Sequence, residues 1–502
     1  MLPLSSYCRT GSFRAGRIAK GLPGGYAVAP LSETAFRGAL LDSFDGHLRR
    51  AGQVLLQLKD RVLLLDLPSG AVAEQERAAG WKFAAELNGG EVGGPLLERS
   101  ALRAFLPVCE IELTQSRVAV LDDSGKTVVR ATVSVLKKGG KRATWMTIHP
   151  LRGYAGDRAR LEQAVVADGF SVAEQVDYYP LLGLRRALYE SRPAIPLDGN
   201  APVFDSAGAI VRTFLDVARK NEPGLVEDLD TEFLHDYRVS LRRVRSLLSL
   251  FKGVYADGDA RRMKAELADI MKQTNRLRDL DVYLLGRSGY YAMVPQTMHA
   301  GLDLMFGVLE AERREALEQV HALFRCAKYG PRMKALSGPM GKGPAADEPT
   351  LHYAQRLILK HYRKVVAIGK TIDAETPDAT VHELRIQCKK LRYLMEFFLP
   401  LFPDNAGKSL LKPLKGLQDV LGRFNDYSVQ RHSLAEFAGQ HPIRGKKGLR
   451  LAESIGALVA TLYQLQLQAR GEVEAGLAGF ANRQTRQAFN KRFAAKTGGE
   501  SA

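Results

Sequence analysis

The chain has 502 residues, of which 45% are apolar, a composition that is typical of a globular protein with several domains and excludes a disordered chain. No apolar run is long enough to span a bilayer, so no membrane insertion is expected. The 72 Lys and Arg residues outnumber the 55 Asp and Glu residues by 17, which favours polyanionic partners: nucleic acid, acidic membrane surfaces or phosphate polymers.

Residues 1–192 predict an α+β domain. Short apolar or alternating runs at 52–67 and 109–136 are typical of strands, and Asp122–Gly125 reads as a hairpin turn within the second run. Residues 158–170 predict a helix that a glycine closes.

A Pro- and Gly-rich segment at 190–205 predicts a linker, and nearly everything beyond it has helical periodicity. A second breaker lies at 338–349. We expect a helical domain at 200–495, with one repeat at 204–337 and another at 350–495. The expected helices lie near 205–220, 232–255, 259–287, 300–328, 350–372, 378–402, 406–435 and 448–480.

Two stretches of this domain share one pattern. "HDYRVSLRRVR" and "HELRIQCKKLR" each carry His, then Arg at offset 3, basic residues at 7 and 8, and Arg at 10. The separation is 382 − 235 = 147 residues, and the same shift relates Arg276 to Arg423 and Asp279 to Asp426. A shift that holds over more than forty residues predicts an all-α duplicated pair of four-helix bundles. The matched residues are His235, Arg238, Arg242, Arg243 and Arg245, then His382, Arg385, Lys389, Lys390 and Arg392.

At about 100° per residue, offsets 0, 3, 7 and 10 lie on one edge of a helix, beside its apolar face. The offset-8 residues Arg243 and Lys390 point elsewhere and are expected to be solvated. A row of like charges is costly unless an anion or acids from other helices neutralise it. Asp279, Asp281 and Asp426 are candidates for internal pairing with the row. The alternative is a solvated charged face.

Three roles are open for His235 and His382: a metal ligand, a histidine satisfied within the bundle, or a direct contact to phosphate through a ring N–H. Arg238 and Arg385 occupy the neighbouring positions on the same face, and cations there disfavour a metal. A phosphate contact would strengthen as the pH falls below the histidine pKa.

The doubled histidine motif, with "RLRDLDV" at 276–282 and its partner "RFNDYSV" at 423–429, resembles the CHAD family, the conserved-histidine α-helical domain. The resemblance covers roughly residues 200–495. It implies paired four-helix bundles related by pseudo-twofold symmetry, whose ligand is inorganic polyphosphate, and one continuous basic surface lined by both copies. The implied polyphosphate-binding residues are His235, Arg238, Arg242, Arg243, Arg245, Arg276, His382, Arg385, Lys389, Lys390, Arg392 and Arg423.

"LDSFDGHLRRAGQVL" at 41–55 resembles a signature of the CYTH family of triphosphate tunnel enzymes. That resemblance implies a metal site built from alternating carboxylates. However, the opening Glu-x-Glu-x-Lys motif is absent, and "EIELT" at 110–114 ends in Thr and lies too late. We therefore expect a degenerate CYTH-like domain without a metal site, without cofactors and without catalysis.

The leading hypothesis is non-catalytic, electrostatic binding of inorganic polyphosphate by a cytoplasmic protein, in possible association with polyphosphate granules. One alternative is a metal-dependent tripolyphosphatase, or another triphosphate hydrolase, acting through the N-terminal domain. A second is non-specific nucleic-acid binding, which the charge permits but which the lack of interleaved exposed aromatic residues disfavours.

Overall fold

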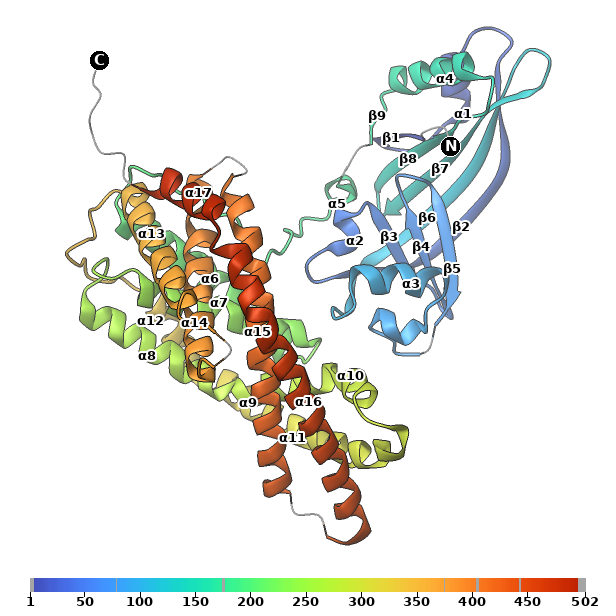
Figure 1. Ribbon diagram of the computed structural model, residues 1–502. Helices are drawn as coiled ribbons and strands as arrows, with labels where there is room; N and C mark the ends of the chain where they lie inside the picture. Colours follow the sequence, from blue (N-terminus) through green and yellow to red (C-terminus); the bar gives the residue numbers. More distant parts are fainter. Residues whose placement is uncertain are drawn as a thin grey trace, which may run out of the picture. The chain divides into compact units, whose positions relative to one another are not determined.

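A computed structural model describes residues 4–77, 79–173, 177–373, 375–402, 406–441 and 444–494. The chain forms two compact units, Met1–Glu190 and Ser191–Ala502, called unit 1 and unit 2 below (Figure 1). Unit 1 combines a sheet with short helices and unit 2 is helical, so the predicted order of an α+β domain followed by an all-α domain is confirmed.

Unit 1 is built on an antiparallel sheet of nine strands in the order β5-β4-β3-β2-β6-β7-β8-β1-β9. This sheet is consistent with the resemblance to CYTH domains. The strands are β1 (Ser5–Thr10), β2 (Ala27–Ser43), β3 (Gln53–Gln57), β4 (Arg61–Asp66), β5 (Ala71–Glu76), β6 (Phe105–Leu121), β7 (Thr127–Lys138), β8 (Lys141–His149) and β9 (Ser171–Val172). The helical segments are α1 (Ala15–Lys20), α2 (His47–Arg50), η1 (Ala84–Leu87), α3 (Gly90–Arg99), α4 (Ala155–Ala167) and α5 (Tyr178–Leu181).

The turn between β6 and β7 is the one predicted at Asp122–Gly125. The Asp122 carboxylate accepts hydrogen bonds from the backbone N–H groups of Ser124 (3.0 Å) and Lys126 (2.9 Å), and Gly125 takes a positive φ of 79°. A left-handed position of this kind favours glycine. The predicted helix at 158–170 is also confirmed, since α4 ends at Ala167 and Gly169 follows with φ 85°.

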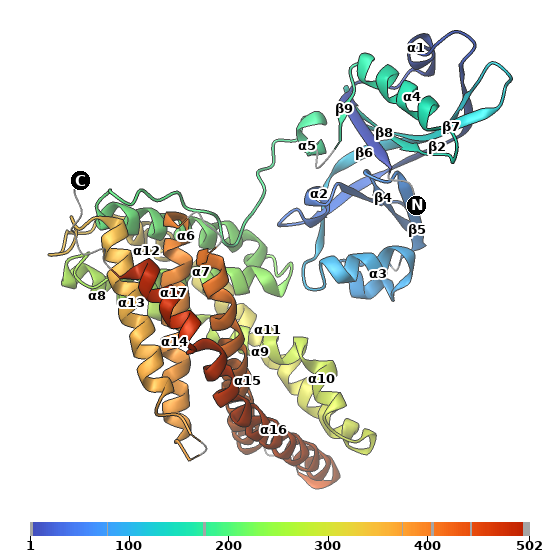
Figure 2. The same cartoon turned by 45° about the horizontal axis from the view of Figure 1, so that its top comes forward.

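Apolar side chains cover both faces of β3 and β4. Val54, Leu56 and Leu63 belong to one buried cluster, whereas Leu55 and Leu64 belong to another that packs against α3. Helices α1 and α4 bury a further cluster at the other end of the sheet (Figure 2).

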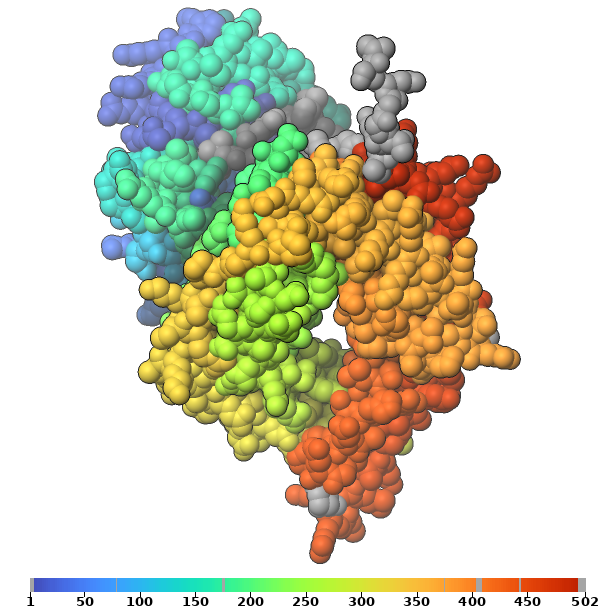
Figure 3. Space-filling view, turned by 90° about the vertical axis from the view of Figure 1, so that its left-hand side faces the viewer, coloured from blue at the N-terminus to red at the C-terminus, as the bar shows by residue number. Residues whose placement is uncertain are grey.

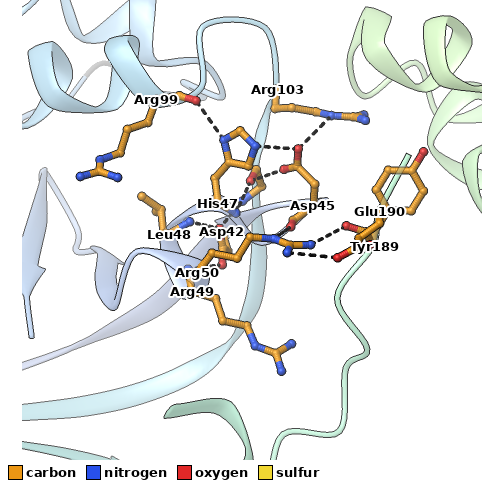
Figure 4. A network of polar contacts seen from close by, with 11 residues as sticks. Asp42, Asp45, His47, Leu48, Arg49, Arg50, Arg99, Arg103, Tyr189 and Glu190 are labelled. Carbon is orange, nitrogen blue, oxygen red and sulfur yellow. Dashed lines mark hydrogen bonds and ion pairs between the residues drawn. The ribbon is translucent and has the colours of Figure 1, made fainter. Parts of the chain in front are cut away.

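The loop that carries the CYTH-like signature is a network of local polar contacts (Figure 4). The buried Asp42 carboxylate accepts from the backbone N–H groups of Ser43, Leu48 and Arg49 at 2.8–3.0 Å. Burial raises the pKa of Asp42, whereas these backbone donors lower it. His47 lies between Asp45 Oδ2 and the Arg99 carbonyl oxygen, both at 2.9 Å. The signature residues thus hold α2 and its loop in place.

Unit 2 consists of helices joined by short connections. They are α6 (Val203–Val226), α7 (Thr231–Leu250), α8 (Asp257–Gln273), α9 (Asn275–Leu285), α10 (Arg287–Ala292), η2 (Gln296–Met298), α11 (His299–Arg325), α12 (Tyr329–Leu336), α13 (Thr350–Gly369), α14 (Asp378–Phe398), η3 (Leu399–Leu401), α15 (Ala406–Gln440), α16 (Gly445–Phe480) and α17 (Arg483–Phe493). None of the described helices is both long and apolar enough to cross a bilayer.

The predicted shift of 147 residues recurs in the starts of these helices, because 350 − 203 and 378 − 231 both equal 147. The residues just before α6 and α13 pair with each other through an antiparallel bridge between Pro202 and Pro349. After α7 and α14, however, the described helices no longer correspond one to one. A pair of duplicated four-helix bundles therefore stays a prediction.

The prediction of a single helix at 259–287 is wrong, because α8 ends and α9 begins on either side of Thr274. The Arg238 guanidinium from α7 donates to the Met271 carbonyl oxygen (2.8 Å), Thr274 Oγ1 (2.6 Å) and Asn275 Oδ1 (2.7 Å). These bonds satisfy polar groups that the break would otherwise leave unpaired. In the second half, α15 runs through the corresponding region without a break.

Candidate anion-binding cavity

The two motif helices, α7 and α14, pack against each other within unit 2 (Figure 1). The Asp230 carboxylate caps α7 by accepting from the backbone N–H groups of Glu232 (2.9 Å) and Phe233 (3.3 Å). At their far ends, Phe251 and Phe398, which are also 147 residues apart, stack with ring centroids 5.1 Å apart and planes 10° apart. Equivalent residues at the ends of the two helices therefore contact each other.

The cationic edges of these helices converge. Arg242 of α7 lies close enough to Arg385 and Lys389 of α14 to affect the ionisation of both. Burial, together with the charges of Arg385 and Arg242, lowers the pKa of Lys389 to about 8. Like charges held this close without a ligand raise the free energy of the empty protein and favour the binding of an anion.

A cavity of about 570 Å³ opens beside these residues. In the space-filling view, an opening separates the yellow-green segment of unit 2 from its orange segment (Figure 3). Helices α7, α9, α11 and α15 line the cavity, so both halves of unit 2 contribute to it. Its lining includes His235 and four arginines: Arg238, Arg242, Arg276 and Arg278.

Arg238 is fixed in the cavity wall by its bonds to the α8–α9 junction. It is buried, and burial together with the charge of Arg242 lowers its pKa to about 10. Both Nη atoms of Arg238 are hydrogen-bonded to the α8–α9 junction. The role of Arg238 is therefore to hold the cavity wall and add positive potential.

His235 lies in a cationic environment. Burial, together with the charges of Arg278, Arg242 and Arg192, lowers its pKa to about 4 against the opposing effect of Asp236. The ring is therefore neutral at physiological pH, with one N–H to donate. In the second motif, His382 instead donates from Nδ1 to Asn425 Oδ1 at 2.8 Å.

Acidic side chains neutralise part of the predicted row. Arg276 pairs with Glu312, Arg423 pairs with Glu472, and Arg385 lies 3.3 Å from Asp426 Oδ1. The predicted pairing of Asp426 with the row is thus observed. Asp281, by contrast, pairs with Arg313 at 2.8 Å, and Arg313 lies outside the row. None of the described acids forms an ion pair with Arg242 or Lys389.

The expectation that Arg243 is solvated is wrong. Its side chain is 5% exposed, lies over the Phe214 ring at 4.9 Å and pairs with Glu396 Oε2 at 2.5 Å. Arg392 meets the other oxygen of Glu396 at 3.4 Å. Arg243 and Arg392 therefore share an internal acid in place of an external anion.

The remaining predicted residues lie at the edges of the site. Arg245 is exposed, and its Nη1 atom lies 3.8 Å from Met271 Sδ. Lys390 is half-buried and faces α13, where burial and the charges of Lys390, Lys360 and Lys364 lower the pKa of His361.

Two cationic residues near the cavity were not predicted. Arg278 lines it, and its buried Nη1 atom has no hydrogen-bond partner among the described residues. Arg278 belongs to the "RLRDLDV" motif, but the repeat does not single it out, because Asn425 stands at the equivalent position of the second half. Arg192 precedes α6 and affects the ionisation of His235. It lies outside the repeat, so no repeat-based argument could have found it. Within the described residues, no group of three or more His, Cys, Asp and Glu side chains is placed to hold a metal ion.

Comparison with known proteins bears on the helical unit. Residues 209–435 match the CHAD domain family, which confirms the family predicted from the doubled histidine motif. Among solved structures, the chain is similar to the crystal structure of the CHAD domain from the plant Ricinus communis, at 23% identity and a TM-score of 0.46, over 57% of this chain and 95% of that one. It is also similar to PptA from Streptomyces chartreusis, at 18% identity and a TM-score of 0.37, over 57% of this chain and 100% of that one. No curated protein matches the chain.

Proposed function

We propose, on the premise that unit 2 carries a CHAD domain, that this unit binds inorganic polyphosphate through the cavity between its two halves. Arg242, Arg278 and Lys389 contact phosphate oxygens, and Arg238 supports them from the wall. The observation that carries the proposal is that arginines of α7 and α9 line one cavity, and that Arg242 lies close enough to Lys389 of α14 to lower its pKa. Neither Arg242 nor Lys389 forms an ion pair with a described acid.

Unsatisfied donors support the same proposal. Buried guanidinium nitrogens without hydrogen-bond partners are costly, so their presence calls for an explanation. Arg278 Nη1 and Arg385 Nε are two such atoms. Phosphate oxygens accept several hydrogen bonds at once, and guanidinium groups match them in geometry as well as charge. Because Arg278 lines the cavity, a phosphate chain there would offer acceptors to its guanidinium group.

A competition titration tests the proposal. We expect long-chain polyphosphate to displace a labelled polyphosphate at concentrations at which double-stranded DNA does not. Affinity should also fall steeply as NaCl is raised, because binding releases condensed counterions. Equal displacement by DNA would contradict the proposal and support the nucleic-acid alternative.

The protonation of Lys389 makes binding depend on pH. Phosphate favours the charged lysine, and the Lys389 pKa in the ligand-free protein is about 8. Affinity should therefore be highest below this pH and fall as the pH rises through it, by up to about tenfold per pH unit. Fluorescence titration at several pH values measures this fall. In the Lys389→Arg variant the fall should be absent, and the same fall in that variant would assign it to another group.

We also propose that unit 1 does not hydrolyse triphosphates. Two observed features support this proposal. Strands β3 and β4 bury apolar side chains on both faces, and the Glu112 carboxylate is paired with Lys137 at 2.7 Å. Incubation of the full chain with tripolyphosphate and Mg²⁺ or Mn²⁺ should release no phosphate above the buffer rate. Sustained release that a Glu110→Gln/Glu112→Gln variant loses would overturn this part of the proposal.

A further inference from the structure

The cavity has a second wall that a phosphate chain does not need. Besides the cations and the carboxylates of Asp279, Asp426 and Glu436, apolar side chains from α9, α11 and α15 line the cavity: Val282, Met305, Leu309, Val429, Leu434 and Phe437. Inorganic polyphosphate has no apolar part to place against them. A ligand that fills the whole cavity must carry both phosphates and an apolar body.

Two residues of this wall are exposed valines. Val282 on α9 is 44% exposed and Val429 on α15 is 55% exposed, and both line the cavity. Their separation is 429 − 282 = 147 residues, so they occupy equivalent positions in the two halves. Exposed apolar side chains that line a cavity can pack against the face of a flat ring.

Polar groups lie among the apolar ones. Gln430, Ser433 and Gln440 line the cavity, and the Ser433 side chain hydrogen-bonds Tyr283 on the opposite helix. Amide and hydroxyl groups can pair with the donors and acceptors at the edge of a nucleobase. A plain hydrocarbon offers the Gln430 and Gln440 amides no hydrogen-bond partner, which disfavours an isoprenoid diphosphate. The volume of about 570 Å³ lies within the range of small-molecule and cofactor sites.

We propose that this cavity binds a nucleoside triphosphate, with the triphosphate on Arg242 and Arg278 and the base between Val282 and Val429. This inference rests on the proposed function, because it assigns the phosphates to the same cations. It goes beyond that function by giving the apolar wall a ligand. The Gln430 and Gln440 amides and the Ser433 hydroxyl pair with the edge of the base.

The test compares ATP, tripolyphosphate and geranyl diphosphate by calorimetric titration of the full chain in metal-free buffer. Charge alone gives ATP no advantage over tripolyphosphate, so tighter binding of ATP requires contacts to the base. In a Val282→Ala/Val429→Ala variant, ATP affinity should fall about tenfold, since each lost buried methyl group weakens binding several-fold. Tripolyphosphate affinity should not change.

Leu285→Ala/Leu449→Ala is the matched control. These leucines are 43% and 62% exposed but do not line the cavity. The control variant should bind ATP like the unmodified protein. If tripolyphosphate binds as tightly as ATP and the valine variant changes nothing, the inference fails while the proposed function stands. Tighter binding of geranyl diphosphate than of ATP also overturns the inference. If neither ATP nor tripolyphosphate binds but long-chain polyphosphate does, the inference fails and the proposed function stands. If long-chain polyphosphate does not bind either, both fail.

Discussion

Reversing the charges of Arg242 and Lys389 together is expected to lower polyphosphate affinity by about a hundredfold or more. Each residue supplies a charge-assisted contact of about 1.5–3 kcal/mol, and glutamate at the same position repels the ligand. The Arg242→Glu/Lys389→Glu variant should fold normally, because Arg242 is exposed and Lys389 only half-buried. Binding is measured with a labelled polyphosphate, and helicity by circular dichroism.

The matched control for this variant is Arg261→Glu/Lys370→Glu. Both residues are exposed, and neither lines the cavity. Arg261 lies on α8, and Lys370 directly follows α13. The control changes the net charge by the same amount, so it separates the local effect from the overall charge. An equal loss of affinity in the control would show that binding depends on net charge alone. Unchanged affinity in the Arg242→Glu/Lys389→Glu variant would show that the converging edges are not the site.

Reversing the charge of Arg238 would not test ligand binding cleanly, because this side chain supports the fold. Its guanidinium holds the carbonyl of Met271 and the side chains of Thr274 and Asn275 at the α8–α9 junction. A glutamate there would place a buried negative charge against these acceptors. Loss of binding in such a variant would report a damaged wall and not a lost ligand contact.

Removing Glu396 is expected to destabilise unit 2 by about 3–5 kcal/mol, because it leaves the buried Arg243 charge without its partner. Arg243 lies beneath the surface over Phe214, and no other acid among the described residues pairs with it. Chemical denaturation of the Glu396→Ala variant measures the loss. Polyphosphate affinity should stay close to that of the unmodified protein under conditions in which the variant is folded, since Glu396 lies outside the cavity lining.

A double replacement supplies the control for Glu396→Ala. In Arg243→Met/Glu396→Leu, apolar side chains of similar size replace both partners, and most of the lost stability should return. Full stability of the single variant would mean that Arg243 reaches solvent, as the helical periodicity had suggested. A large loss of polyphosphate affinity in the folded double variant would place Arg243 among the ligand contacts.

Helical periodicity was enough to predict the cationic edge, but not what each cation contacts. The pattern around His235 and His382 identified two equivalent helices, and these helices pack against each other. The burial of Arg243 depends on its contacts with Glu396 and Phe214, which lie on two other helices. A helical wheel contains no information about the helices that pack nearby, so it placed Arg243 in solvent.

The break at Thr274 shows a second limit of prediction from helical periodicity. Nothing in the local sequence around 259–287 ends a helix strongly, and the continuous periodicity predicted one helix. The break is stabilised from outside by Arg238, 36 residues earlier than Thr274. In the second half, the equivalent Arg385 lies near Asp426, and α15 runs on. Tertiary contacts, rather than local propensity, distinguish the two halves.

The central claim is that α7 and α14 serve one cavity rather than two separate surfaces. The most direct measurement is the calorimetric stoichiometry of a short polyphosphate of defined length on the unmodified protein and on the single variants Arg242→Glu and Lys389→Glu. One chain per protein, with affinity strongly reduced by either single variant, is the predicted result. Two chains per protein, with half of the binding retained in each variant, would contradict it.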